Sequence, residues 1–279
     1  MKNILVPTDF SKNSWNSIVY ALQFYTNETC NFYLLHVTSI SDYNGSNTGM
    51  LPTIDTIDTT LVKETKTKLL RFLKKIKSLS NNPLHNFSVL TSNDYFIDAI
   101  RKHIYEKSID MIIMGTKGAS GLKEAVVGTN TGDLITKVKC PVLVVPENAK
   151  FKFPKEIAFP TDYNLFYQNK ILSSITELSK MFDSSIRILH ITKKDERLTQ
   201  FQQENKEYLH DFFMDEKHSF HRITNSKIDA GIQCFVESRD INLIIMIAKN
   251  LNLFQQILFK PRVEEISYHT EVPFLVLHE

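Results

Sequence analysis

Glycines with one particular spacing are the residues of this chain best suited to chemistry. Gly115 and Gly118 follow an apolar run, and Gly128 and Thr129 precede a segment whose pattern predicts a helix over residues 130–138. Glycines between a strand and a helix let backbone N–H groups approach an anion closely, and the helix dipole favours negative charge there. The spacing therefore predicts an anion site, with the phosphates of a nucleotide as the expected anion.

This spacing is distinct from two better-known phosphate motifs. It lacks the Lys-Ser/Thr ending of a P-loop and the closely spaced glycines of a dinucleotide-binding turn. By itself it also fits an ordinary glycine-rich connection. The elements around the glycines must therefore decide between the two interpretations.

Those elements occur twice along the chain. Four segments return in the same order, with similar residues at corresponding positions. The pairs are residues 3–9 and 156–162, 34–38 and 188–192, 109–114 and 241–246, and 140–144 and 272–276. Such internal repetition predicts two homologous domains, which we place at residues 1–147 and 151–279.

Each domain alternates short apolar runs with amphipathic stretches. In the first domain the runs are residues 2–7, 31–38, 86–91, 109–114 and 141–146. Runs without strict alternation are typical of parallel strands covered on both faces. We expect an α/β fold with a doubly wound sheet in each domain. Ser11 and Asn93 mark predicted helix starts, Leu69 to Leu79 an amphipathic helix, and residues 39–59 a loop.

In such sheets ligands bind at the carboxyl ends of the strands, where the strand order reverses. Asp9 could accept from a ribose hydroxyl or hold a hydrated cation, and Val37 could wall an adenine ring. The hydroxyls of Thr129 and Thr131 could donate to phosphate oxygens. The full set of predicted nucleotide-binding residues is Pro7, Thr8, Asp9, Val37, Met114, Gly115, Gly118, Gly128, Thr129, Asn130 and Thr131.

These signatures together resemble the universal stress protein family, in a tandem two-domain form. They are an opening strand ending in Val-Pro-Thr-Asp-Phe-Ser, a strand ending in Leu-His-Val, the glycine spacing, and a closing Pro-Val-Leu-Val-Val strand. The resemblance implies the five-stranded parallel sheet of the adenine nucleotide alpha hydrolase-like fold, a regulatory role in stress, and ATP as ligand, with Mg²⁺. By position, Asp9 and Val37 match nucleoside contacts, and the three glycines with Thr129 match phosphate contacts.

The resemblance also implies that domains pair through their last strands. Residues 142–145 and 274–277 could pair within one chain as a pseudo-dimer, and a homodimer is a further expectation. The second domain departs from the glycine pattern: Ile247, Asn250, Lys260 and Pro261 stand at the positions of Gly115, Gly118, Gly128 and Thr129. Because proline has no N–H, one anion-binding donor is lost. We therefore expect one nucleotide per chain, in the first domain.

Composition excludes several other classes of protein. The net charge of +2 argues against nucleic acid or a membrane surface as partner. Apolar runs stay well short of the ~20 residues that span a bilayer, and no secretory signal is visible, so a cytoplasmic protein is expected. Cys30, Cys140 and Cys234 are too far apart in sequence to indicate a disulfide framework or a zinc site.

Histidines and serines give no catalytic pattern. His36 and His190 occupy equivalent strand positions and are interpreted as structural, and His210, His218 and His221 as a surface cluster. No nucleophile is paired with a base by spacing, so an enzyme is not the favoured interpretation. The alternatives left open are a slow ATPase, an adenylate-transferring enzyme, or a scaffold that binds no nucleotide.

Overall fold

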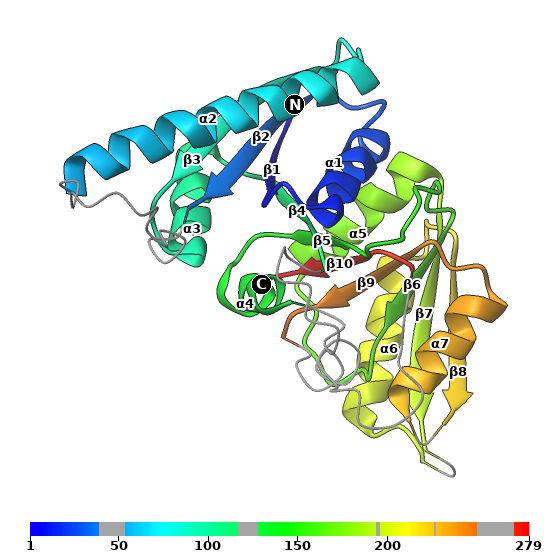
Figure 1. Ribbon diagram of the computed structural model, residues 1–279. Helices are drawn as coiled ribbons and strands as arrows, with labels where there is room; N and C mark the ends of the chain where they lie inside the picture. The colour runs from blue at the N-terminus through cyan, green and yellow to red at the C-terminus, as the bar shows by residue number, and fades with distance from the viewer. Residues whose placement is uncertain (39–53, 117–127, 194–195, 226, 250–270, 279) are drawn as a thin grey trace.

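The computed structural model describes residues 1–38, 54–116, 128–193, 196–225, 227–249 and 271–278 (Figure 1). In the first half strands and helices alternate in the order β1 (Lys2–Pro7), α1 (Lys12–Phe24), β2 (Cys30–Val37), α2 (Ile54–Leu79), β3 (His85–Ser92), α3 (Phe96–Lys107), β4 (Met111–Gly115), α4 (Thr129–Lys137) and β5 (Val142–Val145). The second half continues with β6 (Glu156–Pro160), α5 (Asn169–Phe182), β7 (Ser185–Thr192), α6 (Gln200–Phe212), β8 (His218–Thr224), α7 (Ile228–Ser238), β9 (Leu243–Ile247) and β10 (Phe274–Leu277).

The described strands form one ten-stranded sheet in the order β3-β2-β1-β4-β5-β10-β9-β6-β7-β8. Neighbouring strands are parallel, apart from the antiparallel pair of β5 and β10. In each half the chain builds outward from a central strand, β1 or β6, and then returns to its other side with β4 or β9. The strand order therefore reverses between β1 and β4, and again between β6 and β9.

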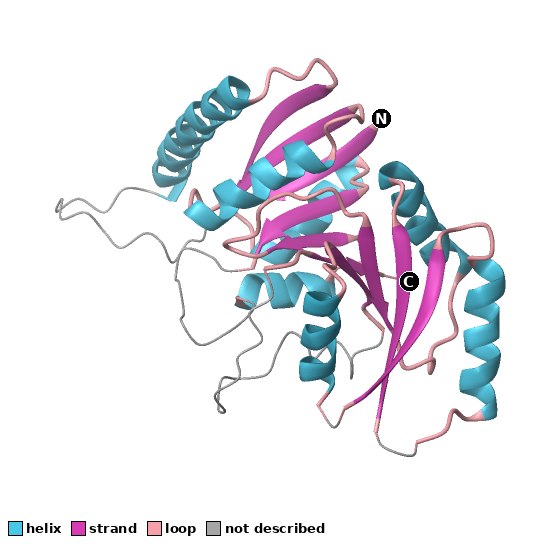
Figure 2. Ribbon diagram, turned by 90° about the vertical axis from the view of Figure 1, so that its right-hand side faces the viewer, coloured by secondary structure: helices cyan, strands magenta, loops and turns pink. Residues whose placement is uncertain are grey.

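Helices cover both faces of this sheet (Figure 2). The core on one face joins buried residues of α1, α2, α5 and α6, such as Ile18 and Ile175, and the core on the other joins α3, α4 and α7, such as Ile100 and Phe235. Strands buried on both sides need no polar residues, which explains the continuous apolar runs in the sequence. The predicted α/β fold with a parallel sheet flanked by helices is confirmed.

Local capping explains where the helices begin. Ser11 caps α1 as predicted, since its hydroxyl oxygen accepts the N–H of Ser14 at 3.2 Å. The N-cap of α3 is Tyr95 rather than Asn93, and no side chain caps that helix. The predicted loop at residues 39–59 is wrong for residues 54–59, which belong to α2, and residues 39–53 lie outside the described part of the chain.

The two halves of the sheet meet at β5 and β10, in the centre of Figure 1. Leu143 lies opposite Leu275 in this antiparallel pair, and the two side chains are 0% and 2% exposed. Just beyond β10, His278 contacts the carbonyl oxygen of Ile135 in α4 through Nε2 at 2.7 Å. Apolar burial and a hydrogen bond therefore join the two halves.

The segment that follows β5 is held against α1. The Nδ2 group of Asn16 donates to the carbonyl oxygens of Pro146 and Ala149 at 3.1 and 3.0 Å, and the Ala149 side chain is buried. Two hydrogen bonds from one side chain therefore fix the direction in which the chain leaves the first half.

Three histidines with lowered pKa values make the stability of the folded chain depend on pH. Burial lowers the pKa of His103, His221 and His278 below the ordinary value of 6.5. The folded state thus favours neutral imidazole, and the unfolded chain binds more protons once the pH falls below 6.5. We expect the free energy of unfolding to fall from about pH 7 to about pH 5, by roughly 1.4 kcal/mol for each unit by which a pKa is lowered.

Urea titrations across this pH range measure the effect. Replacing His278 by glutamine keeps an N–H donor for the carbonyl oxygen of Ile135 but removes the titrating group. The pH dependence of the His278→Gln variant should be flatter than that of the parent chain. An equal dependence in both proteins would show that His278 does not contribute.

Candidate functional site

The turn after β1 places the first group of predicted site residues. The Oγ1 atom of Thr8 accepts the N–H of Phe10 at 3.1 Å, and Asp9 Oδ1 accepts the N–H of Ser11 at 3.0 Å. The Thr8 hydroxyl donates to Ser14 Oγ at 3.0 Å in a buried contact. This network forces Phe10 into the left-handed region, with φ 63°. Thr8 therefore shapes the turn, and Asp9 is held half-buried at the carboxyl edge of the sheet.

Beside this turn, β2 and β4 bring apolar residues to the same edge. Val37 ends β2 and Met114 lies next to the end of β4, and both pack into the core on the face covered by α3 and α4. One residue earlier on β2, His36 Nδ1 donates to the carbonyl oxygen of Thr8 at 2.7 Å, and its ring centre lies 4.7 Å from that of Phe10. His36 is thus structural, as the sequence suggested.

The start of α4 is tied to the end of β4 by two hydrogen bonds. The N–H of Gly128 donates to the carbonyl oxygen of Thr116 at 2.6 Å, and the hydroxyl of Thr131 donates to the carbonyl oxygen of Gly115 at 3.0 Å. Gly118 lies in residues 117–127, outside the described part of the chain. The two ends of the glycine segment are therefore pinned together.

These bonds correct two details of the sequence-based interpretation. The Thr131 hydroxyl was expected to donate to phosphate, but the side chain is 2% exposed and its hydrogen is used by Gly115. Gly128 was expected to contact phosphate, but its N–H already donates to the carbonyl oxygen of Thr116. The N–H groups of Thr129 and Asn130, exposed residues in the first turn of α4, remain as donors without an intrahelical partner.

The electrostatics of this helix start favour an anion. No side chain caps α4 at Gly128, and its first turn contains no acidic residue. Asp133, further along the helix, pairs with Lys137 at 2.9 Å instead. Among the described residues, the first turn and the N-cap of α4 therefore contribute no carboxylate that would neutralise the positive end of the helix dipole.

The physical explanation for a glycine differs between the two ends of the segment. A Cβ atom on Gly115 would lie 3.2–3.3 Å from the backbone and Cβ of Asn13 in α1, so this glycine permits close packing of β4 against α1. Gly128 has φ −67° and ψ 158°, extended backbone that any residue adopts. Gly115 is therefore explained by packing alone, whereas local backbone geometry does not require glycine at position 128.

We expect Gly115→Ala to lower the free energy of unfolding by about 1 kcal/mol. The methyl group would press on the backbone of Asn13, and such overpacking outweighs the lower entropy of the unfolded alanine chain. Gly231→Ala is the matched control: the tightest contact of its Cβ, at 3.0 Å, is with the movable Cδ1 of Ile191, and alanine favours the helix. Urea titrations should show a loss for the first variant and no loss for the second; equal effects would contradict the packing argument.

The second half repeats the turn but changes the end of the fourth strand. Thr161 Oγ1 accepts the N–H of Tyr163 at 3.0 Å, and His190 Nδ1 donates to the carbonyl oxygen of Thr161 at 2.9 Å, as in the first half. At the end of β9, however, Ile247 is buried where β4 has glycine. The helix α5 begins only at Asn169, well behind the turn, whereas α1 starts close behind Asp9. The positions Asn250, Lys260 and Pro261 lie outside the described residues.

The comparison with protein families decides where this chain belongs. The family described as the universal stress protein family matches residues 1–146. The chain belongs to the universal stress protein family. Among curated relatives, Universal stress protein MJ0531 of Methanocaldococcus jannaschii is 27% identical over 153 residues, which cover 53% of this chain and 84% of the relative. Universal stress protein MJ0577 of the same organism is 26% identical over 156 residues, covering 52% and 94%.

This universal stress protein is also similar to solved structures along its whole length. A universal stress protein from Archaeoglobus fulgidus aligns with a TM-score of 0.66 at 16% identity, covering 99% of this chain and 96% of the other. A functionally unknown protein, PA1789 of Pseudomonas aeruginosa, aligns with a TM-score of 0.60 at 13% identity, covering 100% and 92%. These likenesses establish the fold of both halves.

Other kinds of site receive no support from the part of this universal stress protein that is described. No helix there is both long and apolar enough to cross a bilayer, and no group of three His, Cys, Asp or Glu side chains is placed to bind a metal ion. His210 and His218 form a pair, with Nδ1 and Nε2 3.1 Å apart, while His221 bonds to Ser219 instead. The three cysteines are free thiols, of which Cys234 is exposed.

Proposed function

We propose that this universal stress protein is a regulatory module that binds one ATP, with Mg²⁺, in a first domain of residues 1–147. The start of α4 carries the proposal. It is a helix N-terminus without a side-chain cap or a first-turn carboxylate, fixed to the end of β4 by two hydrogen bonds. A preorganised terminus of this kind attracts phosphate groups. The resemblance to the family is the reason for expecting an adenine nucleotide as the ligand.

The described residues give each part of the nucleotide a binding group. The N–H groups of Thr129 and Asn130, with the Thr129 hydroxyl, would hold phosphate oxygens. Asp9, held at the carboxyl edge of β1, would accept from a ribose hydroxyl or hold hydrated Mg²⁺. Val37 and Met114, on the α4 face of the sheet, would contact the adenine ring. When bound, Mg²⁺ would neutralise phosphate charge.

We further propose that residues 151–279 form a second domain that binds no ATP in this manner. A buried isoleucine ends β9 in place of glycine, and the aligned sequence gives lysine and proline in place of the glycine and threonine that start α4. The antiparallel pairing of β5 with β10 supports an arrangement of the two domains as an intramolecular pseudo-dimer.

Thermal unfolding with different nucleotides tests the adenine preference. A ligand that binds only the folded state stabilises it by about 2.7 kcal/mol at a free concentration of about 100 Kd. We expect Mg-ATP to raise the Tm by several degrees and Mg-GTP at equal concentration to raise it much less. Equal shifts with both nucleotides, or none with either, would contradict the proposal.

A further inference from the structure

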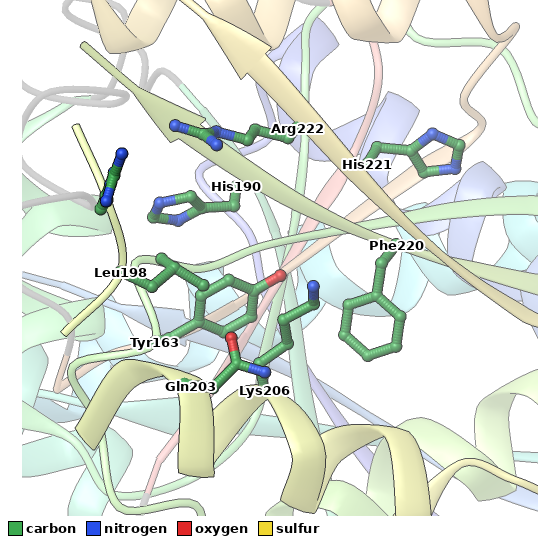
Figure 3. A pocket seen from close by; sticks show the side chains of 9 residues that line it. Tyr163, His190, Leu198, Gln203, Lys206, Phe220, His221 and Arg222 are labelled. Carbon is green, nitrogen blue, oxygen red and sulfur yellow. The ribbon is translucent and has the colours of Figure 1, made fainter. Parts of the chain in front are cut away.

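The second half contains a pocket of about 390 Å³ that lies between α6 and strands β7 and β8 (Figure 3). Its lining comes from the turn after β6, from β7 and β8, and from α6 with the segment before it. It is lined neither by β9 nor by Asp162 or Ile191, the counterparts of Asp9 and Val37, so it is distinct from the position that corresponds to the proposed ATP site. Its volume falls within the range of ~300–1,000 Å³ typical of small-molecule pockets.

Positive side chains from three different elements line this pocket. Arg197 comes from the segment before α6, Lys206 from α6 itself, and Arg222 from β8, and no carboxylate is among the lining residues that the structure describes. Within the part of the chain that the structure describes, none of these three cations forms an ion pair. Gathering like charges is unfavourable, and an anion between them would relieve the repulsion.

The cations are held at defined places around the pocket. Arg222 lies opposite His190 in the register of β7 and β8, and its Nη2 donates to the carbonyl oxygen of Glu196. A guanidinium has five N–H donors, so this bond leaves others for a ligand. Lys206 Nζ lies 5.7 Å from the centre of the Phe220 ring, and Figure 3 shows the lysine extending between Phe220 and Tyr163.

The carboxylate nearest to Arg197 along the chain, that of Glu196, is already engaged in hydrogen bonds. The Glu196 carboxylate accepts the N–H of Lys193 at 2.9 Å and the hydroxyl of Thr192 at 3.2 Å, and these hydrogen bonds lower its pKa. It therefore stabilises the end of β7 and does not line the pocket.

Buried rings give the pocket a rigid apolar side. Tyr163 and His190 are 2% and 8% exposed, and their rings stack with centres 4.9 Å apart. His190 is fixed in turn by its bond to the Thr161 carbonyl oxygen. Phe220, half-buried, continues this surface. The pocket thus combines exposed or half-buried cations with buried and half-buried rings, which suits a ligand that has one charged and one apolar end.

Among the described residues, only the second half places a cation beside the histidine of its second strand. In the first half the histidine of β2, His36, lies opposite Thr91 of β3, where the second half has Arg222 opposite His190. The half that lacks the glycine motif therefore has a cation beside its structural histidine, where the first half has threonine.

We propose that this pocket binds a small organic anion, one that carries a phosphate or carboxylate group on a compact apolar body. The second half is then a binding module for its own ligand, separate from the nucleotide site of the first.

Calorimetric titration of the full chain tests the proposal with three probes: phenyl phosphate, benzoate and inorganic phosphate. At least one of the two aromatic anions should bind, with a Kd on the order of 0.1–1 mM, and more tightly than inorganic phosphate. A preference for phenyl phosphate identifies the charged group as phosphate, and a preference for benzoate identifies it as carboxylate.

Charge-neutralising variants locate the binding. Lys206→Gln and Arg222→Gln should each weaken binding of the preferred anion about tenfold, because each removes a charge-assisted contact. The matched control is Lys170→Gln, since Lys170 is exposed on α5 and does not line the pocket. Unfolding midpoints measured alongside check that the variants fold. No binding of any probe, or equal affinity in the parent and in both pocket variants, would overturn the proposal.

Discussion

Replacing Gly128 by valine should weaken ATP binding at least a hundredfold while the chain still folds. The backbone there, with φ −67° and ψ 158°, is one that valine adopts readily, and the bond from its N–H to Thr116 involves only backbone. The branched side chain would instead stand at the start of α4, where the phosphates must approach the N–H groups. A hundredfold loss corresponds to about 2.7 kcal/mol, the scale of a lost charge-assisted contact or two.

The control for this substitution is the N-cap of a helix in the second half. Gln168 precedes α5, also has extended backbone and also makes no side-chain capping bond. Gln168→Val should therefore change helix capping as much as Gly128→Val does, by less than about 1 kcal/mol, and leave ATP affinity unaltered. Titrations of both variants with Mg-ATP, with urea titrations for stability, measure the two effects. Unaltered affinity in Gly128→Val would contradict the placement of the phosphates.

Replacing Leu275 by alanine should lower the free energy of unfolding by about 2–5 kcal/mol. Its side chain is 2% exposed and lies opposite Leu143 at the centre of the ten-stranded sheet, in a core that α1 and α5 share. Removing it leaves a cavity in the seam between the two halves. Leu79, 60% exposed at the end of α2, provides the control, and Leu79→Ala should cost less than about 0.5 kcal/mol.

The same variant tests whether the halves unfold together. Trp15 is the single tryptophan and packs in the first half, 5.1 Å from Phe72, so its fluorescence reports unfolding of that half. Far-ultraviolet circular dichroism reports both halves. In urea the two signals should change together, and Leu275→Ala should shift both. A Trp15 transition that stays in place while circular dichroism shifts would show that the seam does not couple the halves.

The fold could be predicted from the sequence because the sequence patterns of its strands are strong. Parallel strands buried on both faces leave continuous apolar runs, and the repeat doubles the evidence for each. Side-chain caps such as Ser11 mark a helix start directly. The helix α3 begins at Phe96 after an N-cap, Tyr95, whose side chain makes no capping bond, so its start could not be located from the sequence. Leu79 follows the apolar pattern of α2 but lies at its last residue, where the sheet no longer covers it.

For the site, the sequence could name residues but not divide their roles. That Gly115 packs on Asn13, and that the Thr131 hydroxyl is used by Gly115, depends on how closely α1, β4 and α4 approach one another. Spacing along the chain contains no such information. The cationic pocket of the second half was missed for the same reason, since Arg197, Lys206 and Arg222 converge only through the pairing of β7 with β8 and the packing of α6.

The stoichiometry of nucleotide binding distinguishes a chain with one ATP site from a chain with two. Nucleotide-free full-length protein is titrated with Mg-ATP in a calorimeter, and the number of sites per chain is read from the isotherm. We expect one site per chain, because the aligned sequence of the second half has Lys260 and Pro261 in place of the Gly128 and Thr129 that start α4. Two sites per chain, or no binding heat at any temperature tried, would contradict it.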